Sequence, residues 1–422
     1  MTDQWTYRVY FGISPDALLD AIESKSPLYP KAVANIDRGQ LAAVAYRLGD
    51  SERAHDVLLN TCRGLEVECG GEDDAPRIAG PSPVDLDTRV VWAFPGQGAQ
   101  KVGLLHGLYK RSAVFRDSLK RHLDAASSAV GVNFLDALYP DEGSTEQTEA
   151  RLTDTAYCQP VMVGVTLALA AWFSEAGLRM DGAMGHSLGE FAAVSALGGV
   201  ESEGLMRFVA LRGQIMVDAL EGEDMGAMAA VMAPEPAVRE ALSTHPDVVI
   251  ANINQPKQTV ISGPTASVEA AVKSLRRARL PGKKLSVSHA FHSPLMQKPA
   301  RKLLSEIEKL TFSDLTRPLH SAILVESINK AEVLEEMFRC HAESPVRYLD
   351  TLKALGNSEV PQLFVEMGPG KTLTSFARYT LGEEGCALES SAISPDGEAA
   401  LAEALVGLVS YGIPVGSGLL DS

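Results

Sequence analysis

The stretch MGHSLGEFAA (184–193) places Ser187 in a G-x-S-x-G frame that runs from Gly185 to Gly189. This frame is typical of a nucleophilic serine on a tight turn between a strand and a helix. The apolar residues GAMG before the serine predict the strand, and EFAAVSAL after it predicts the helix. Most turns of this kind belong to hydrolases. The sequence therefore predicts an acyl-serine enzyme, and leaves open whether water or another group accepts the acyl unit.

The composition is that of a globular protein with more than one domain. The chain has 422 residues, of which 45% are hydrophobic and 22% are charged. Its formal net charge of −16 argues against nucleic acid and anionic membranes as partners, although a local basic patch could still bind an anionic cofactor. The N-terminus lacks the pattern of a signal peptide, and the longest apolar stretch, VMVGVTLALAAWF, is too short to span a bilayer. We expect a cytoplasmic protein in which that stretch forms a buried helix.

The cysteine pattern favours reduced thiols. Five cysteines are present, an odd number, and no C-x-x-C motif occurs. We therefore expect neither a disulfide framework nor a zinc site. The cysteines are Cys62, Cys69, Cys158, Cys340 and Cys386.

Residues 1–70 predict a small α/β unit. Strands are expected in YRVYFGIS, VLLN and LEVEC, and helices in PDALLDAIESKS and GQLAAVAYRLGD. The stretch GGEDDAPRIAGPSPVD (70–85) is rich in Gly, Pro and Asp and predicts a linker. A new domain then opens with TRVVWAFPGQGAQ, a strand that runs into a glycine-rich turn.

Residues 226–288 show a different pattern of expected strands and helices. Strands and helices are expected there in the order βαββαβ, which is the ferredoxin-like arrangement. This unit interrupts a larger domain, which resumes with SHAFHSPLM, the helix KPARKLLSEIEKL, the loop ESPVRYLD and the strand QLFVEMGPG.

A serine nucleophile needs a base, because its free hydroxyl is a poor nucleophile near neutral pH. His289 and His292 lie together in SHAFHSPLM, whereas His186, next to the serine, should point away from the tip and support the turn. A lone histidine is more often a satisfied core residue, and two in one loop weaken that alternative. FPGQGAQ (94–100) is a second tight turn whose backbone N–H groups could bind an oxyanion, with a plain structural turn as an equal alternative.

Arg212 falls on the apolar face of its helix, in register with Leu205, Phe208, Ile215 and Ala219. A buried guanidinium needs a carboxylate partner. No acidic residue lies three or four positions away on the same helix. The partner is therefore a distant acid of the fold or the carboxylate of a ligand, which suits the planar donors of arginine.

Six motifs in this order resemble one enzyme family. FPGQGAQ, then QP before a long helix, then GHSLGE, then an arginine, then HAFHSPLM, then FVEMGPG are similar to the acyltransferase domains of polyketide synthases. They are also similar to the stand-alone malonyl-CoA:acyl carrier protein transacylases. The resemblance covers about residues 88–395, and a small linker domain precedes such domains in polyketide synthases.

The resemblance implies an α/β fold. Its large subdomain would be α/β-hydrolase-like, with a parallel sheet and a nucleophile elbow, and would carry the ferredoxin-like insertion after a small N-terminal α/β linker domain. The expected boundaries are 1–85 for the linker domain, 86–225 and 289–395 for the two parts of the large subdomain, 226–288 for the insertion and 396–422 for a C-terminal segment.

The resemblance also implies catalytic roles. Ser187 would be the nucleophile and His292 its base, so that the two form a dyad. The backbone carbonyl of Ser344 would orient the base in place of an acid. The backbone N–H groups of Gln97 and Leu188 would form the oxyanion hole. One departure, KVGLLHGLY after FPGQGAQ, falls on a supporting helix.

Four further residues are expected to bind the substrate. Arg212 would hold the free carboxylate of the extender unit, and Gln159 would line the pocket. His289 belongs to the HAFH stretch that accompanies malonyl selection in this family. Phe291 would stand beside C2 of the acyl group and reject methylmalonyl.

The expected reaction is ping-pong transfer of malonyl from coenzyme A to the phosphopantetheine thiol of an acyl carrier protein, in polyketide biosynthesis. We expect no metal and no permanently bound cofactor, and a neighbouring ketosynthase domain, with the chain as a piece of a longer synthase. The alternatives are a serine thioesterase or esterase of α/β-hydrolase type and a non-catalytic docking domain. The thioesterase or esterase alternative predicts an acid between the serine and the histidine in chain order, and an HGGG-like oxyanion loop. The sequence contains no HGGG motif.

A basic cluster stands out in this acidic chain. It could guide the anionic coenzyme A and carrier protein, or it could be a solvated helix face. The cluster consists of Lys273, Arg276, Arg277, Arg279, Lys283 and Lys284.

Overall fold

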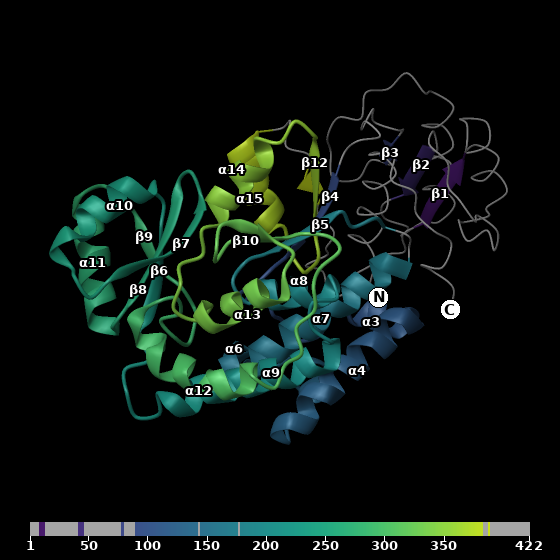
Figure 1. The fold of residues 1–422 in the computed structure, drawn as a ribbon, viewed down its shortest axis with the longest axis horizontal. Helices are drawn as coiled ribbons and strands as arrows, with labels where there is room; N and C mark the ends of the chain where they lie inside the picture. Colours follow the sequence, from purple (N-terminus) through teal and green to yellow (C-terminus); the bar gives the residue numbers. More distant parts are fainter. Residues whose placement is uncertain are drawn as a thin grey trace, which may run out of the picture.

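A six-stranded sheet runs through the middle of the computed structural model (Figure 1). The structure describes residues 8–12, 41–45, 77–79, 89–141, 144–175, 178–382 and 387–388. Across the sheet the strands are β11 (Glu326–Ile328), β10 (Leu319–Ser321), β5 (Gly182–Gly185), β4 (Arg89–Phe94), β12 (Gln362–Glu366) and β13 (Ala387–Leu388). All neighbours are parallel except β10 and β11. The strands β4, β5 and β12 are almost wholly buried, as expected for a parallel sheet covered on both faces.

The carboxyl ends of β12, β4 and β5 lie side by side. Phe94 at the end of β4 is in register with Gly185 at the end of β5, and Glu366 of β12 pairs with Ala93. Three turns therefore leave the same edge of the sheet, at residues 95–98, 186–188 and 367–371. This edge is where open parallel sheets bind their ligands.

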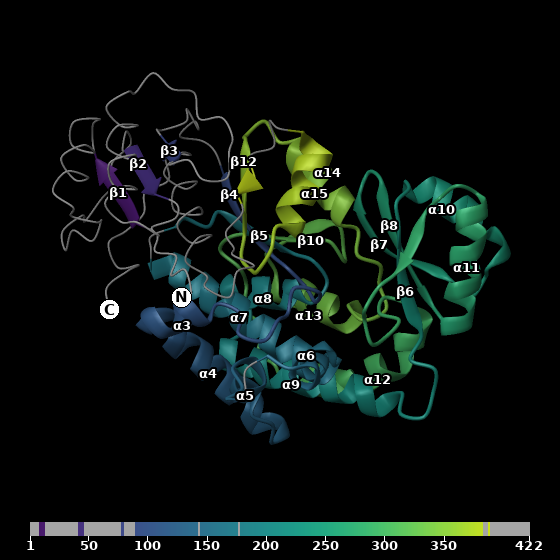
Figure 2. The same ribbon diagram turned by 180° about the vertical axis from the view of Figure 1, so that it is seen from behind.

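Helices cover both faces of the sheet. In Figure 1, and from behind in Figure 2, α4, α7 and α9 lie together on one side of the sheet, and α14 and α15 lie on the other. The helices of the large unit are α3 (His106–Arg111), α4 (Ala113–Val130), α5 (Phe134–Leu138), α6 (Glu146–Thr153), α7 (Thr155–Glu175), α8 (Gly189–Ala196), α9 (Ser202–Ala219), α12 (Gln297–Ile307), α13 (Ala331–Cys340), α14 (Tyr348–Gly356) and α15 (Thr372–Leu381), with a 3-10 turn, η2 (Pro294–Met296), before α12.

Helix α7 contains the apolar stretch for which we predicted a buried helix. Among the described residues, it is the one helix long and apolar enough to cross a membrane by length and composition. The prediction that this segment is too short is therefore wrong, because the helix extends beyond the quoted stretch to 21 residues. Burial is the stronger argument, since 83% of its apolar window is buried inside the protein, as in a core helix.

A second, four-stranded sheet lies at one end of the molecule (Figure 1). Its elements follow the predicted order: β6 (Ala227–Val231), α10 (Glu235–Ala241), the 3-10 turn η1 (Leu242–Thr244), β7 (Val249–Gln255), β8 (Gln258–Gly263), α11 (Thr265–Arg277) and β9 (Gly282–Lys284). The strands are antiparallel in the order β7-β8-β6-β9. The last strand ends at Lys284, before the end of the predicted stretch KKLSVS.

The outer edge of β7 is joined to the large unit. Ile253 N–H donates to the carbonyl of Val346 at 2.8 Å, and Val346 N–H donates to the carbonyl of Ala251 at 2.8 Å. Asn252 and Val346 thus form an isolated parallel bridge. The loop before α14 completes the sheet edge that β7 would otherwise leave unpaired.

Near the N-terminus, β1 (Arg8–Gly12), β2 (Leu41–Ala45) and β3 (Arg77–Ala79) form a third, antiparallel sheet. Two predictions fail here. Residues 41–45 were predicted to be helical and form the middle strand, because pairing on both sides outweighs a short helical pattern. Residues 77–79 form a strand within the predicted linker.

Several predictions fall outside the described residues. They are the rest of the N-terminal linker domain, the C-terminal segment 396–422 and the state of Cys62, Cys69 and Cys386. Of the described cysteines, Cys158 is a buried free thiol and Cys340 is a half-buried one.

Candidate active site

The turn after β5 carries Ser187 in a strained conformation. Its φ is 50°, in the left-handed region that non-glycine residues rarely adopt. The flanking glycines make the turn possible. A Cβ at Gly185 would lie 2.2 Å from the backbone nitrogen of Glu190, and one at Gly189 would lie 2.0 Å from the carbonyl oxygen of Phe94. The G-x-S-x-G sequence therefore lets α8 start directly against β4 and holds the serine at the tip.

His292 lies next to Ser187 at the sheet edge. Its Nε2 lies 2.6 Å from Ser187 Oγ, and its Nδ1 lies 2.7 Å from the carbonyl oxygen of Ser344. Since a carbonyl only accepts, Nδ1–H donates to Ser344, and the bare Nε2 accepts from the serine hydroxyl. Burial, supported by the charge of Arg212, lowers the pKa of His292 to about 3. The ring is therefore neutral and can take a proton.

A fourth histidine, which the sequence analysis did not single out, also contacts Ser187. His341 is 1% exposed, and its Nε2 lies 3.0 Å from the main-chain carbonyl of Ser187. Its ring lies 4.3 Å from that of Phe191. Burial holds the pKa of His341 well below its usual value, so it is neutral and donates to the carbonyl. The available signal was its place three residues before Ser344.

Glu190 was also missed, although it ends the motif GHSLGE. Its buried carboxylate accepts from the Ser321 hydroxyl at 2.9 Å and from the N–H groups of Ala322 at 2.6 Å and Ile323 at 3.1 Å. Burial raises the pKa of Glu190 to about 7. Arg347 N–H in turn donates to the Ala322 carbonyl at 2.7 Å. Glu190 thus joins the first turn of α8 to the loop after β10, and through it to the segment that carries Ser344.

The glycine-rich turn after β4 packs directly on the Ser187 turn. A Cβ added to Gly96 would lie 2.7 Å from the carbonyl oxygen of His186 and 3.7 Å from the nitrogen of Leu188. Among the hydrogen bonds between described residues, neither Gln97 N–H nor Leu188 N–H is a donor. Both groups therefore remain available for an oxyanion.

His186 joins this region to the small sheet. Its Nε2–H donates to Asn254 Oδ1 at 2.8 Å, and its ring packs against those of Tyr348 and Phe376 at 5.4 and 6.3 Å. Its hydrogen bond therefore reaches into the small sheet and not to the serine hydroxyl.

Arg212 is 4% exposed on α9, and no carboxylate of the described residues pairs with it. Its Nη1–H donates to Gln159 Oε1, and its guanidinium lies 5.1 Å from the centre of the Phe191 ring. Gln159 Nε2 donates onward to the Thr155 hydroxyl at 2.8 Å. Burial lowers the pKa of Arg212 to about 9, which still leaves it charged near neutral pH. The neutral amide satisfies one donor and leaves the charge uncompensated.

A cavity of about 360 Å³ contains the Ser187 hydroxyl and His292. Gln97 and Phe291 also line it, whereas Arg212, Gln159 and His289 do not. His289 is 1% exposed, with Nδ1 2.8 Å from the Ser288 hydroxyl and Nε2 without a partner among the described residues. The structure therefore gathers the predicted dyad and Gln97 around one cavity, whereas Leu188 and three of the predicted substrate residues do not line it.

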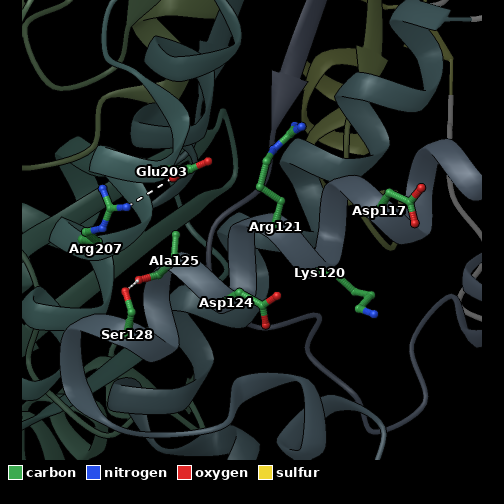
Figure 3. A pocket seen from close by; sticks show the side chains of 8 residues that line it. All are labelled: Asp117, Lys120, Arg121, Asp124, Ala125, Ser128, Glu203 and Arg207. Carbon is green, nitrogen blue, oxygen red and sulfur yellow. Dashed lines mark hydrogen bonds and ion pairs between the residues drawn. The ribbon is translucent and has the colours of Figure 1, made fainter.

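A larger cavity, of about 540 Å³, lies between α4 and α9 (Figure 3). It is lined mainly by exposed charged side chains of both signs, including the ion pair of Arg207 and Glu203 at 3.2 Å. No predicted site residue reaches it. In the described part of the chain, no group of three or more His, Cys, Asp or Glu residues is placed to hold a metal ion.

Comparison with known proteins shows the family of the chain. The family model described as "Acyl transferase domain" matches residues 91–409. A malonyl CoA-acyl carrier protein transacylase of Synechocystis sp. is 30% identical over 293 residues, which cover 69% of the chain and 94% of that protein. An iterative polyketide synthase of Emericella nidulans is 30% identical over 345 residues, which cover 78% of the chain but only 12% of the synthase.

A solved structure shows the same fold. The acyltransferase domain from the second module of the salinomycin polyketide synthase superposes with a TM-score of 0.75 at 28% identity, over 95% of the chain and 87% of that domain.

Proposed function

The chain belongs to the acyl transferase domain family, and from this premise we propose that it moves a malonyl group from malonyl-CoA to the phosphopantetheine thiol of an acyl carrier protein. The malonyl group is held on Ser187 between the two halves of the reaction. The observation that carries this proposal is the Ser187–His292–Ser344 chain of hydrogen bonds beside two unused backbone N–H groups. Because the chain spans a small part of its polyketide synthase relatives, a parent synthase and a neighbouring ketosynthase are part of the proposal.

In the first half-reaction His292 Nε2 takes the proton of Ser187 as Oγ attacks the thioester carbon. The negative oxygen that develops accepts from Gln97 N–H and Leu188 N–H. The carbon–sulfur bond then breaks, and the leaving thiolate takes the proton from His292. In the second half-reaction the carrier thiol gives its proton to His292 as its sulfur attacks the malonyl ester carbon. The bond between that carbon and Ser187 Oγ then breaks, and Oγ takes the proton back from His292.

Arg212 holds the malonyl carboxylate in this scheme. Support comes from a buried guanidinium whose partner among the described residues is a neutral amide and not an acid. A carboxylate would replace the Gln159 carbonyl as acceptor, and the Gln159 amide would turn to donate to it. Because the cavity does not reach Arg212, substrate entry requires side chains between them to move.

Phe291 and His289 are proposed to set the preference for malonyl. Phe291 lines the cavity directly before His292, which supports a contact between its ring and a branch at C2. His289 acts through Phe291, whose ring lies 5.6 Å from its own. A cytoplasmic location and a scheme without metal or resident cofactor complete the proposal.

The finer architecture is proposed in the same way. The strand order β7-β8-β6-β9 supports a ferredoxin-like insertion at 226–288, between two parts of an α/β-hydrolase-like subdomain at 86–225 and 289–395. The linker domain at 1–85 and the segment 396–422 stay predictions.

The test is the intact mass of the protein after mixing with malonyl-CoA. A malonyl adduct that persists until a carrier protein is added supports the transferase, and Ser187→Ala should remove it. Rapid release of free malonate without a carrier would instead support the thioesterase alternative. That alternative is disfavoured because His292 bonds to a carbonyl where a hydrolase triad has an acid.

A further inference from the structure

The strands β7 and β8 form a wall of the cavity that contains Ser187. Asn252 on β7 is opposite Val260 on β8, and Gln258 lies two residues before Val260. Side chains two apart on a strand share a face, so these three project together, and all three line the cavity. Asn252 and Gln258 lie diagonally across the β7–β8 pair, where the register shifts between Ile253 and Gln255.

Asn252 presents an unused hydrogen-bond acceptor. The side chain is 5% exposed, and its Oδ1 has no partner among the described residues. Leaving a buried carbonyl oxygen unpaired costs about 1–3 kcal/mol. The unpaired oxygen indicates that Asn252 Oδ1 accepts a hydrogen bond from a bound ligand.

Gln258 presents an unused donor on the same wall. His186 Nε2–H donates to Asn254 Oδ1 at 2.8 Å, and Asn254 Nδ2 donates to Gln258 Oε1 at 2.8 Å. Because Gln258 accepts in this series of hydrogen bonds, its Nε2 donor is left at the end of the series. Its single contact among the described residues is the sulfur of Met232 at 3.9 Å, a weak acceptor.

An acceptor and a donor on the same cavity wall match the two ends of a secondary amide. We propose that Asn252 Oδ1 accepts from the amide N–H, and Gln258 Nε2 donates to the amide C=O, of the arm that carries the reacting thiol. Leu285 and Val287, also in the cavity lining, suit the methylene spacers beside such an amide. The inference rests on the proposed function, since both coenzyme A and a carrier protein bring a pantetheine arm with secondary amides close to sulfur.

The experiment compares acyl donors that differ in this amide. Formation of malonyl-Ser187 is measured with malonyl-CoA, with malonyl-pantetheine and with the malonyl thioester of propanethiol, which has no amide. The variants are Asn252→Leu and Gln258→Met, which keep the side-chain size. Gln255→Met is the matched control, because Gln255 is also buried with an unpaired Oε1 but does not line the cavity.

We expect kcat/KM for malonyl-pantetheine, relative to the amide-free thioester, to fall about tenfold in Asn252→Leu and by a similar factor in Gln258→Met. Gln255→Met should keep the ratio of the unmodified chain. Each variant is measured on both substrates, so a general loss of folded protein lowers both kcat/KM values equally and leaves their ratio unchanged. Gln258 is half-buried, so its variant keeps the test valid if Asn252→Leu does not fold.

Transfer from malonyl-Ser187 to a holo carrier protein tells the two sources apart. If only acylation is slowed, the amide site formed by Asn252 and Gln258, here called the cradle, binds the arm of coenzyme A. If only transfer is slowed, the cradle binds the arm of the carrier protein. If both are slowed, it binds both arms. The cradle is overturned if both variants keep the kcat/KM ratio of the unmodified chain and also keep its rate of transfer. It is also overturned if Gln255→Met loses as much as they do. Neither outcome contradicts the proposed acyltransferase function. If no thioester acylates the unmodified chain, the proposed function fails and the cradle with it.

Discussion

Ser187 is held by two histidines that follow it by 105 and 154 residues along the chain. His292 contacts the hydroxyl that we propose as the nucleophile, and His341 contacts the main-chain carbonyl of the same residue. His292 is itself in the left-handed region, with φ 57°. Two strained residues thus meet at the reacting centre, and their neighbours fix both.

Replacing His292 by alanine removes the proposed proton acceptor. We expect malonyl-Ser187 to form at least about a hundredfold more slowly, the usual loss for a general base. The measurement is the rate of adduct formation by quenched mass spectrometry. His289→Ala should cost far less, because His289 does not line the cavity. Near-normal labelling of the His292 variant would show that another group is the base.

Replacing Arg212 by alanine should change the choice of acyl group. The malonyl carboxylate would lose a charge-assisted hydrogen bond, so malonyl transfer should fall about ten- to a hundredfold relative to acetyl transfer. Competition between malonyl-CoA and acetyl-CoA gives the ratio. Arg207→Ala, on the exposed side of the same helix, is the control. Equal losses with both substrates would mean that Arg212 supports the core and does not bind the substrate.

Replacing Phe291 by serine should relax the rejection of methylmalonyl. Excluding a methyl group is worth roughly 1–3 kcal/mol, or about 10- to 200-fold in kcat/KM. The unmodified chain should therefore prefer malonyl-CoA clearly but not absolutely, and the variant should narrow that preference more than it slows malonyl turnover. Labelling from a mixture of the two thioesters measures this. If the unmodified chain labels equally with both, Phe291 does not face C2.

At the scale of elements, Glu190 ties α8 to the loop after β10 with three hydrogen bonds. Its pKa is raised from 4.5 to about 7. Between those values the folded chain keeps a proton that the unfolded chain has released, so the contribution of Glu190 to stability falls as the pH rises through this window.

Glu190→Gln cannot lose that proton. We expect the stability of this variant, relative to the unmodified chain, to rise between about pH 5 and pH 8, by at most about 3 kcal/mol. Urea unfolding at the two pH values gives the difference. Glu240→Gln, on the exposed surface of α10, is the control. A difference that does not change with pH would mean that Glu190 is already ionised in the folded chain at pH 5.

The elements near the serine were predictable because their signals are local. A strand, a G-x-S-x-G turn and a helix follow one another within 182–196, and the glycine spacing alone demands the tight turn. Contacts between distant segments have no such signal. Gln159 as the partner of Arg212, and Ser321 as the partner of Glu190, follow only from how α7, α9 and β10 pack. The strand at 41–45 was missed for the same reason, since pairing with β1 and β3 decides it.

At the scale of the whole molecule, the basic cluster lies next to the cavity in the sequence, because residues that line the cavity follow directly after it. The residues Lys283 and Lys284 end β9, and the next residues inward, Leu285 and Val287, line the cavity. Lys284 is paired with Glu269 at 3.1 Å, and Arg276 Nη2 donates to the carbonyl of Gly282. The exposed Arg277 and Lys283 are therefore the better residues for a test of partner attraction.

Reversing Arg277 and Lys283 to glutamate should slow transfer to a carrier protein. The loss should be greater at low salt than at high salt, because screening weakens attraction between exposed charges. Lys120→Glu with Arg121→Glu on α4, far from the small sheet in both views of the fold, is the matched control (Figures 1 and 2). A transfer rate indifferent to both charge and salt would leave the cluster as a solvated helix face.

The bridge between β7 and Val346 makes the small sheet part of the machinery that aims the base. Val346 follows Ser344 by two residues, so the strand that walls the cavity and the carbonyl that orients His292 are one mechanical unit. A rotation of the small sheet that widens the cavity must break two backbone hydrogen bonds or drag that carbonyl along. A movement of the small sheet is therefore expected to move the carbonyl that accepts from His292 Nδ1 as well.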